Sequence, residues 1–288
     1  YKRPATIPGI SQPSGEGYQR ESYIFEFDEK MTQSLRNLAS QNHVTLNTVL
    51  QALWGILLGK YNGLDDVVFG AVVSGRPPEI RGVETMIGLL INLIPIRFRI
   101  APDQTFRDVV QTLHDESAQG REHHYFSLAQ IQAQTQLKRN LLDHVIVFEN
   151  YPLDNALNEI FDLQVSSATD QASGSREQGA GIKIDRYEHF DHTNYDLTIL
   201  IHPEVTLEFH FIYNCSVYDP EIIEMIGPYM ESIARTILRD EQVKIEDIEI
   251  LSSDEKERYL KSVTEKIGKI RHQASDIEDQ ASGIRHHT

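Results

Sequence analysis

The segment from Thr45 to Tyr61 carries apolar side chains on almost every side of a helix, and this feature constrains the fold most. Its large apolar residues are Leu46, Val49, Leu50, Leu53, Trp54, Leu57 and Leu58. A helix without a polar face must be covered all round by other parts of the chain, and Asn62-Gly63 is a typical signal for its end. A chain of 288 residues, 40% of them apolar, can supply that cover. We therefore expect one large domain, or two small lobes, built around this helix.

Periodic segments on both sides of this helix predict alternating strands and helices. Alternation at 23–27 favours a strand, and Asp28 can cap the helix that follows. Apolar or alternating runs predict further strands at 67–73, 94–100, 145–148, 182–187, 197–201 and 207–213. Helices are expected at 105–120 and after Asp219-Pro220, and a hairpin turn at His202-Pro203-Glu204. This order of elements predicts an α/β sandwich with a mixed β-sheet.

The charge balance and the cysteine content exclude several classes of protein. The 27 Lys and Arg residues face 43 Asp and Glu residues, which argues against a nucleic-acid or membrane-surface binder because both need basic patches. Cys215 is the single cysteine, so intrachain disulfides and multi-cysteine metal sites are excluded. The sequence has no apolar run of about 18 residues and no apolar signal core at its start. We expect an acidic, soluble, cytoplasmic protein.

The string His192-Thr-Asn-Tyr-Asp196 contains the HxxxD core of an acyltransferase signature. In that chemistry the histidine is a general base for the attacking nucleophile, and the aspartate organises the site. However, Leu197 stands where the signature has glycine. The residues favour the other interpretation, in which Tyr195-Asp196-Leu197 opens a strand and His192 lies in a loop.

Two other histidine groups have weaker patterns. His123-His124 resembles half of a paired-histidine base, but Ser127-Leu128 occupies the positions where Asp and Gly are needed, which favours a structural role. His189, Asp191 and His192 are residue types that bind metals. On a strand, however, His192 would point to the opposite face from the other two. We therefore expect no metal site.

Polar residues beside two predicted strands allow two interpretations each. Ser74-Gly75-Arg76 follows a buried strand, where the glycine permits an unusual backbone angle and the prolines after it stiffen the chain. This segment is either a tunnel wall or a strand-ending turn. Asn92 is a lone polar residue in the apolar stretch 87–97, so its amide either ties loops together or faces a ligand channel. Arg97 is expected to form an ion pair or to lie at a rim.

Several linked motifs resemble those of the condensation domains of nonribosomal peptide synthetases. They follow the family's order over roughly residues 20–260, at Asp65–Pro77, Ile87–Arg97, Val147–Pro152, Asn194–Thr198, Phe209–Asn214 and Ile248–Ser252. The resemblance implies an α/β fold similar to chloramphenicol acetyltransferase, in one lobe of a V-shaped pair. It also places Asp196 in the family's "DLT" strand sequence, so the HxxxD string is then coincidental.

The family's active histidine lies in an HHxxxDG motif on the N-terminal lobe, and this sequence contains no such motif. The resemblance therefore implies that the chain is the C-terminal lobe, without a catalytic residue of its own and inactive alone. It implies a hinge at 1–20, the lobe at 21–252, and a linker with a polar tail at 253–288. It also implies that Ser74, Gly75, Arg76 and Asn92 border the substrate tunnel.

In the family, an amine on an acceptor carrier protein attacks a thioester on a donor carrier protein. The phosphopantetheine arms of both carriers enter the tunnel, and no cofactor is bound directly. The implied partners are the N-terminal lobe, the two peptidyl carrier proteins and a neighbouring adenylation domain, with no nucleic acid and no membrane. Two alternatives stay open: a non-catalytic module that docks carrier proteins, and a free-standing acyltransferase that uses His192 and Asp196.

Overall fold

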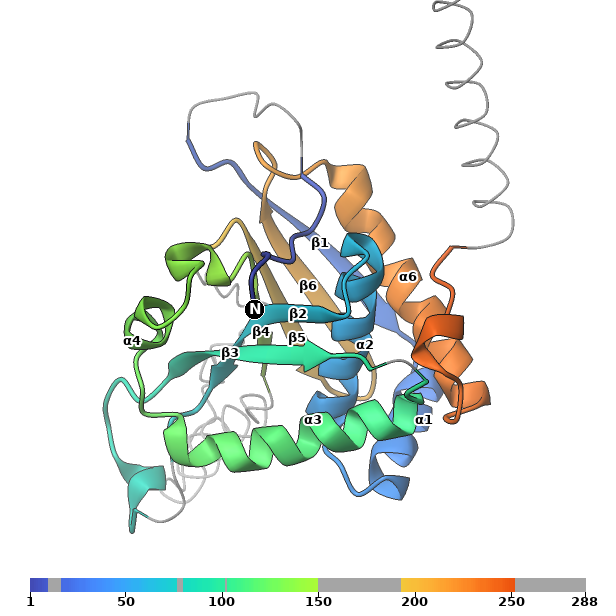
Figure 1. Ribbon diagram of the computed structural model, residues 1–288, viewed down its shortest axis with the longest axis horizontal. Coiled ribbons are helices and arrows are strands. Elements are labelled where there is room, and N and C mark those ends of the chain that lie inside the picture. Colours follow the sequence, from blue (N-terminus) through green and yellow to red (C-terminus); the bar gives the residue numbers. More distant parts are fainter. Residues whose placement is uncertain (10–16, 77–79, 102, 150–192, 252–288) are drawn as a thin grey trace, which may run out of the picture.

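The computed structural model describes residues 1–9, 17–76, 80–101, 103–149 and 193–251. Within them, six strands form one sheet in the order β1-β6-β5-β4-β2-β3 (Figure 1). Strand β4 is parallel to β2 and to β5, and the other neighbours are antiparallel. The predicted mixed sheet is confirmed. Its strands are β1 (Arg20–Phe27), β2 (Asp66–Val73), β3 (Asn92–Arg99), β4 (Val145–Phe148), β5 (Leu197–Pro203) and β6 (Leu207–Asn214).

The helices begin and end at the signals that the sequence carries. Asp28 accepts a hydrogen bond from the Met31 amide, and Thr45 accepts one from the Thr48 amide. Gly63 ends the apolar helix in the left-handed conformation. The helices are α1 (Glu29–Gln41), α2 (Leu46–Asn62), α3 (Phe106–Gly120), α4 (Leu128–Ala133) and α6 (Pro220–Arg239), with short 3-10 turns η1 (Val83–Thr85), η2 (Arg121–His123), η3 (Lys138–Leu141) and η4 (Ile245–Asp247).

Helix α2 lies at the centre of the fold, as its all-apolar sequence predicts. It contacts α1, α3, α6 and β2, and Figure 1 shows it in front of the sheet with those helices around it. Leu53, Trp54 and Ile56, which point to different sides of α2, are all buried. Each such side chain contributes roughly 1.5–3 kcal/mol when it leaves water, so α2 organises the main core.

Strand β2 separates this main core from a smaller one. Val67, Phe69 and Ala71 face the main core, whereas Val68 faces a second cluster with Leu141 and Leu142. Successive side chains of a strand point to opposite faces, which explains the division. Leu128 and Ile131 of α4 pack on the second cluster, and Leu141 of η3 belongs to it. Helix α4 was not predicted from the sequence, because its six residues are too few to show a helical period.

The predicted hairpin turn at His202–Glu204 is wrong by two residues. Strand β5 continues through Pro203, which pairs with Leu207, and the chain turns after it. The guanidinium of Arg36 donates to the carbonyls of Pro203 (2.8 Å) and Glu204 (2.6 Å). This contact from α1 stabilises the later turn, and local sequence could not reveal it. The predicted strand at 182–187 and the tail at 253–288 lie outside the described residues.

Residues 1–9, which we call the strap, are packed against the domain and lie within the segment 1–20 that the resemblance implies to be a hinge. Ala5 and Ile7 are 2% and 3% exposed and belong to the main core. Figure 1 shows the start of the chain over β2. Among the helices of the described part of the chain, none is long and apolar enough to cross a membrane.

Candidate functional site

The four residues proposed to border a tunnel meet at one end of the β2–β3 pair. Val73 at the end of β2 is paired with Asn92 at the start of β3. Ser74, Gly75 and Arg76 therefore leave the sheet where Asn92 enters it. Antiparallel pairing brings these two sequence motifs together, although sixteen residues or more separate Asn92 from them.

Gly75 has the unusual backbone angle that was expected. Its φ is +58°, in the left-handed region that favours glycine. A Cβ atom at this position would lie 1.7 Å from the carbonyl oxygen of Leu90. The backbone before β3 therefore approaches the backbone after β2 more closely than any side chain would permit.

Arg76 holds the segment between the two strands. Its guanidinium donates hydrogen bonds to the carbonyl oxygens of Val83 and Met86, the latter at 3.1 Å. A charged donor forms stronger hydrogen bonds to carbonyls than a neutral one does. Arg76 thus stabilises the η1 turn, and its guanidinium already binds two backbone carbonyls.

Asn92 ties a second loop to the same place. Its Nδ2 donates to the carbonyls of His124 (2.6 Å) and Phe126 (2.8 Å), and its Oδ1 accepts from the amide of Leu93 (2.9 Å). Both N–H groups of the amide are therefore used by backbone. These contacts support the first interpretation of Asn92, in which its amide ties loops together.

The segments held by Arg76 and Asn92 expose a group of large apolar side chains, which we call the apolar rim. Ile87 and Leu89 are almost fully exposed, and the rings of Tyr125 and Phe126 are stacked with centroids 4.6 Å apart. Large apolar side chains left exposed on neighbouring segments in this way are typical of a contact site. The exposure of these residues was not predicted from the sequence, because an apolar run resembles a buried strand. The apolar rim consists of Ile80, Met86, Ile87, Leu89, Ile91, Tyr125 and Phe126.

His123 and His124 have structural surroundings. Burial lowers the pKa of His124, and the nearby Arg121 lowers it further, so this imidazole is neutral at pH 7. The ring of His123 packs against Phe126 with centroids 6.1 Å apart. Within the described residues neither imidazole forms an ion pair with a carboxylate. Arg97 forms the predicted ion pair, donating two hydrogen bonds to Asp66.

Asp196 of the HxxxD string joins two strands. Its Oδ1 accepts from the side-chain amide of Asn214 (2.8 Å), and its carbonyl accepts from the Asn214 backbone amide (2.8 Å). This carboxylate therefore helps to connect the start of β5 to the end of β6. His192, His189 and Asp191 lie outside the described residues. Within the described ranges, no group of three or more His, Cys, Asp or Glu side chains is placed to hold a metal ion.

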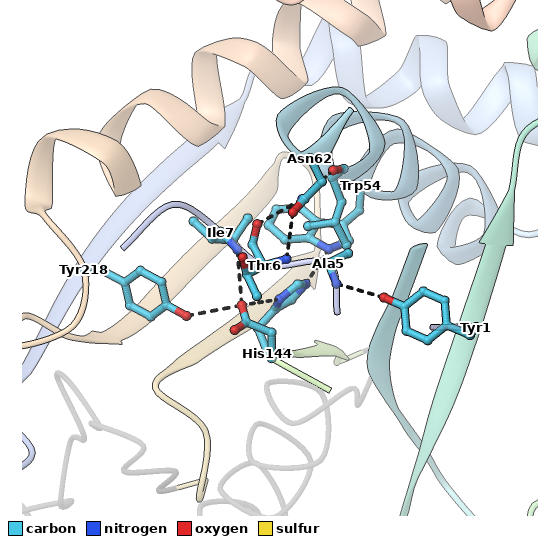
Figure 2. A network of polar contacts seen from close by, with 10 residues as sticks. Tyr1, Ala5, Thr6, Ile7, Trp54, Asn62, His144 and Tyr218 are labelled. Carbon is cyan, nitrogen blue, oxygen red and sulfur yellow. Dashed lines mark hydrogen bonds and ion pairs between the residues drawn. The ribbon is translucent and has the colours of Figure 1, made fainter. Parts of the chain in front are cut away.

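A buried polar network at the start of β4 was not found from the sequence (Figure 2). His144 has no exposed surface, and its Nε2 accepts a hydrogen bond from the indole of Trp54 (2.8 Å). This contact places the imidazole proton on Nδ1, which lies 3.3 Å from Oδ2 of Asp143. Because its free nitrogen is already occupied, His144 is arranged as a connector and not as a general base. The available signal was an Asp-His pair directly before an apolar strand.

The hydroxyl of Tyr218 donates to the same Asp143 oxygen at 3.3 Å. Burial raises the pKa of Tyr218 strongly, and the nearby carboxylates of Asp143 and Asp196 raise it further. The phenol therefore stays protonated and remains a donor. The network thus connects β4, α2 and the loop before α6.

Comparison with known proteins gives one consistent result. The sequence profile of the family described as "Condensation domain" matches residues 2–260. Gramicidin S synthase 2 of Brevibacillus brevis is 39% identical over 260 residues, which are 89% of this chain and 6% of that protein. Tyrocidine synthase 2 of Brevibacillus parabrevis is 36% identical over 265 residues, which are 92% of this chain and 7% of that protein. The chain thus spans a small part of the curated relatives that it matches.

Solved structures show the same fold at low sequence identity. The first condensation domain of the CDA synthetase superposes with a TM-score of 0.59 at 16% identity, covering 83% of this chain and 50% of that chain. A four-domain nonribosomal peptide synthetase bound to AMP and glycine gives a TM-score of 0.66 at 19% identity, covering 88% of this chain and 18% of that chain. The expected fold, an α/β sandwich similar to chloramphenicol acetyltransferase, is confirmed.

Proposed function

The chain belongs to the condensation-domain family of nonribosomal peptide synthetases, and on that premise we propose that it is the C-terminal lobe of a two-lobed domain that forms amide bonds. In the proposed reaction, the amine of an acceptor group attacks the carbonyl carbon of a donor thioester. A C–N bond forms, the C–S bond breaks, the donor arm leaves as a thiol, and the amine loses one proton. The base that takes this proton belongs to the preceding lobe.

One observation carries the proposal. The chain covers about half of a solved condensation domain, and its sequence lacks the HHxxxDG motif that carries the family's active histidine. A lobe without that motif can supply binding surface and position. Positioning an amine against a thioester accelerates the reaction without many charged groups.

In this proposal the end of the β2–β3 pair contributes to the tunnel wall, and the apolar rim meets the preceding lobe. Ser74 is exposed, whereas Gly75, Arg76 and Asn92 fix the backbone around it. Ile87 and Leu89 would each contribute roughly 1.5–3 kcal/mol if the other lobe buried them. A rigid backbone with an apolar border suits a passage that must exclude water.

The proposed partners follow from the family. The lobe would receive the phosphopantetheine arms of a donor and an acceptor carrier protein, with no directly bound cofactor, in the cytoplasm. Its hinge would lie at 1–20, the lobe itself at 21–252, and a linker towards an adenylation domain at 253–288.

The test is a condensation assay read by mass spectrometry with a loaded donor and acceptor carrier pair. The chain is assayed alone and fused behind the N-terminal lobe of the matching domain of gramicidin S synthase 2, with that protein's own complete domain as the positive control. We expect product from the fusion and none from the chain alone. Product from the chain alone would overturn the proposal and would make His192→Ala the next variant. A fusion that forms no product while the control domain is active would also overturn the proposal.

A matched pair of variants tests the apolar rim. Leu89→Glu places a charge in the rim and should abolish product in the fusion. Val205→Glu changes an exposed apolar residue in the β5–β6 turn, 70% exposed and outside the rim, and should leave product unchanged. Equal activity of the two variants would show that the rim is not part of the interface between the lobes.

The exposed rim also favours a second function, a non-catalytic module that docks carrier proteins. In that case the chain alone would bind a carrier protein, and the Leu89→Glu variant would not. Binding of this kind together with a silent fusion would support the docking module over the catalytic lobe.

A further inference from the structure

Side chains accept hydrogen bonds from three successive amides of the strap, and two of these side chains, Asn62 and Asp143, lie outside it. The amide of Ala5 donates to the hydroxyl of Tyr1 (2.8 Å), that of Thr6 to Oδ1 of Asn62 (3.1 Å), and that of Ile7 to Oδ2 of Asp143 (3.2 Å). The side chain of Asn62 also donates back to the carbonyl of Thr6 (3.0 Å). Because the contacts from Asn62 and Asp143 are made by individual side chains, single substitutions can loosen the strap without removing a strand from the sheet.

Asp143 is the point where the strap meets the buried network of Figure 2. One oxygen, Oδ2, receives the Ile7 amide, the Tyr218 hydroxyl and Nδ1 of His144. Through His144 the carboxylate is connected to Trp54 at the centre of the core. The imidazole is completely buried and the indole almost completely, so the carboxylate is connected to groups that close packing holds in place.

The strap leads to the strand that carries the predicted tunnel wall. Tyr1 packs on the second cluster, which contains Val68 of β2. From Val68 the strand runs directly to Ser74, a distance of about 20 Å at the rise of an extended chain. Any lobe joined before residue 1 would therefore be attached over β2.

We propose that Asp143 is a positioning residue for amide-bond formation: by fixing the strap to the core it sets how the preceding lobe sits against the end of the β2–β3 pair. This inference rests on the proposed function. In the proposed reaction Asp143 touches no reacting atom. It acts by holding the strap in place. Its removal should therefore change how often the two lobes are correctly aligned and leave carrier docking alone.

The first experiment measures hydrogen exchange in the peptide covering the strap, using this chain alone. Asp143→Ala should speed exchange at the Ile7 amide by roughly tenfold or more, because a charged acceptor is lost. Asp143→Asn keeps an acceptor of the same shape and should lie between Asp143→Ala and the unchanged chain, which also makes it the variant of choice if alanine impairs folding. Asp108→Ala is the matched control, because that carboxylate caps α3 away from the strap and its loss should leave strap exchange unchanged. Unchanged exchange in both Asp143 variants would overturn the attachment.

The second experiment measures condensation kinetics in the two-lobe fusion with the same variants. We expect Asp143→Ala to lower kcat about tenfold with little change in KM for the acceptor carrier, and Asp143→Asn to restore part of the loss. Asp108→Ala should change neither constant. A released strap with unchanged kcat would overturn the positioning role and leave the proposed function intact. A fusion without product before any substitution would instead refute the proposed function, while the exchange result would still decide whether Asp143 holds the strap.

Discussion

Replacing Gly75 with alanine should destabilise the domain by about 2–5 kcal/mol. The left-handed conformation at φ +58° costs an alanine roughly 1–2 kcal/mol. The new Cβ would also lie 1.7 Å from the carbonyl oxygen of Leu90, which would have to retreat by more than about 1 Å. Forcing a methyl group into such a contact typically costs a further 1–3 kcal/mol. Arg76 and Asn92 hold the neighbouring backbone on both sides, so the retreat would disturb both contacts.

Gly82→Ala supplies a matched control for this prediction. Gly82 also has a left-handed backbone, with φ +79°, but the nearest atom to its Cβ position is the Thr85 hydroxyl oxygen at 4.0 Å. Gly82→Ala should therefore lose only the conformational part, roughly 1–2 kcal/mol. The difference between the two variants isolates the close approach of Gly75 to Leu90.

Urea unfolding of the two variants and the unchanged chain measures these free energies, with equal m-values required for the comparison. Hydrogen exchange at the amides of Met86 and Leu90 should increase in Gly75→Ala, because their turn bonds lie in the displaced segment. If Gly75→Ala and Gly82→Ala agree within about 0.5 kcal/mol, the close backbone approach does not constrain this position and our reasoning fails.

Three further substitutions test other contacts. Trp54→Phe should lower the free energy of unfolding by about 1–3 kcal/mol in thermal melts, since it leaves a buried nitrogen of His144 without its donor; an unchanged melt would contradict the network. Asn92→Ala should cost about 1–2 kcal/mol and speed exchange in the loop that it ties, and unchanged exchange there would argue against the tie. The hydrogen bonds from Arg97 lower the pKa of Asp66, so their stabilisation is present above the ordinary carboxyl pKa of about 4 and is lost as the pH falls through the lowered folded-state pKa. Arg97→Ala should therefore flatten the dependence of urea midpoints on pH below about pH 5, and an unchanged slope would count against the ion pair.

Local patterns were enough to predict the six strands of the sheet and the longer helices. Helix α2 was predicted from its apolar surface and its Asn62-Gly63 end, and both bounds agree with the structure to within a residue. This succeeds because caps and hydrophobic periods act over one or two turns of chain. Helix α4 was missed for the same reason, since its capping box of Ser127 and Gln130 is followed by too short a period.

For the candidate site, the residues were predicted before the structure was known, but the role of Asn92 was not. The resemblance predicted that Ser74, Gly75, Arg76 and Asn92 belong to one site. The register of β2 and β3 places them at the same end of this strand pair. The sequence left two roles open for Asn92, because an amide in an apolar stretch needs partners but does not name them. The carbonyls of His124 and Phe126, more than thirty residues away, decided its role as a tie.

The sequence by itself determined the order of strands and helices, the central place of α2 and membership in the family, because these follow from side chains close together in the chain. Only the tertiary structure decided that residues 1–9 are a strap, that Asp143 receives Ile7 from 136 residues away, and that Ile87 and Leu89 face outwards. The physical reason is that hydrogen-bond partners and exposure depend on which distant segments the fold brings together. Each buried polar group needs a hydrogen-bond partner in the folded chain, and the hydrophobic period of a short segment does not specify which distant residue that partner will be.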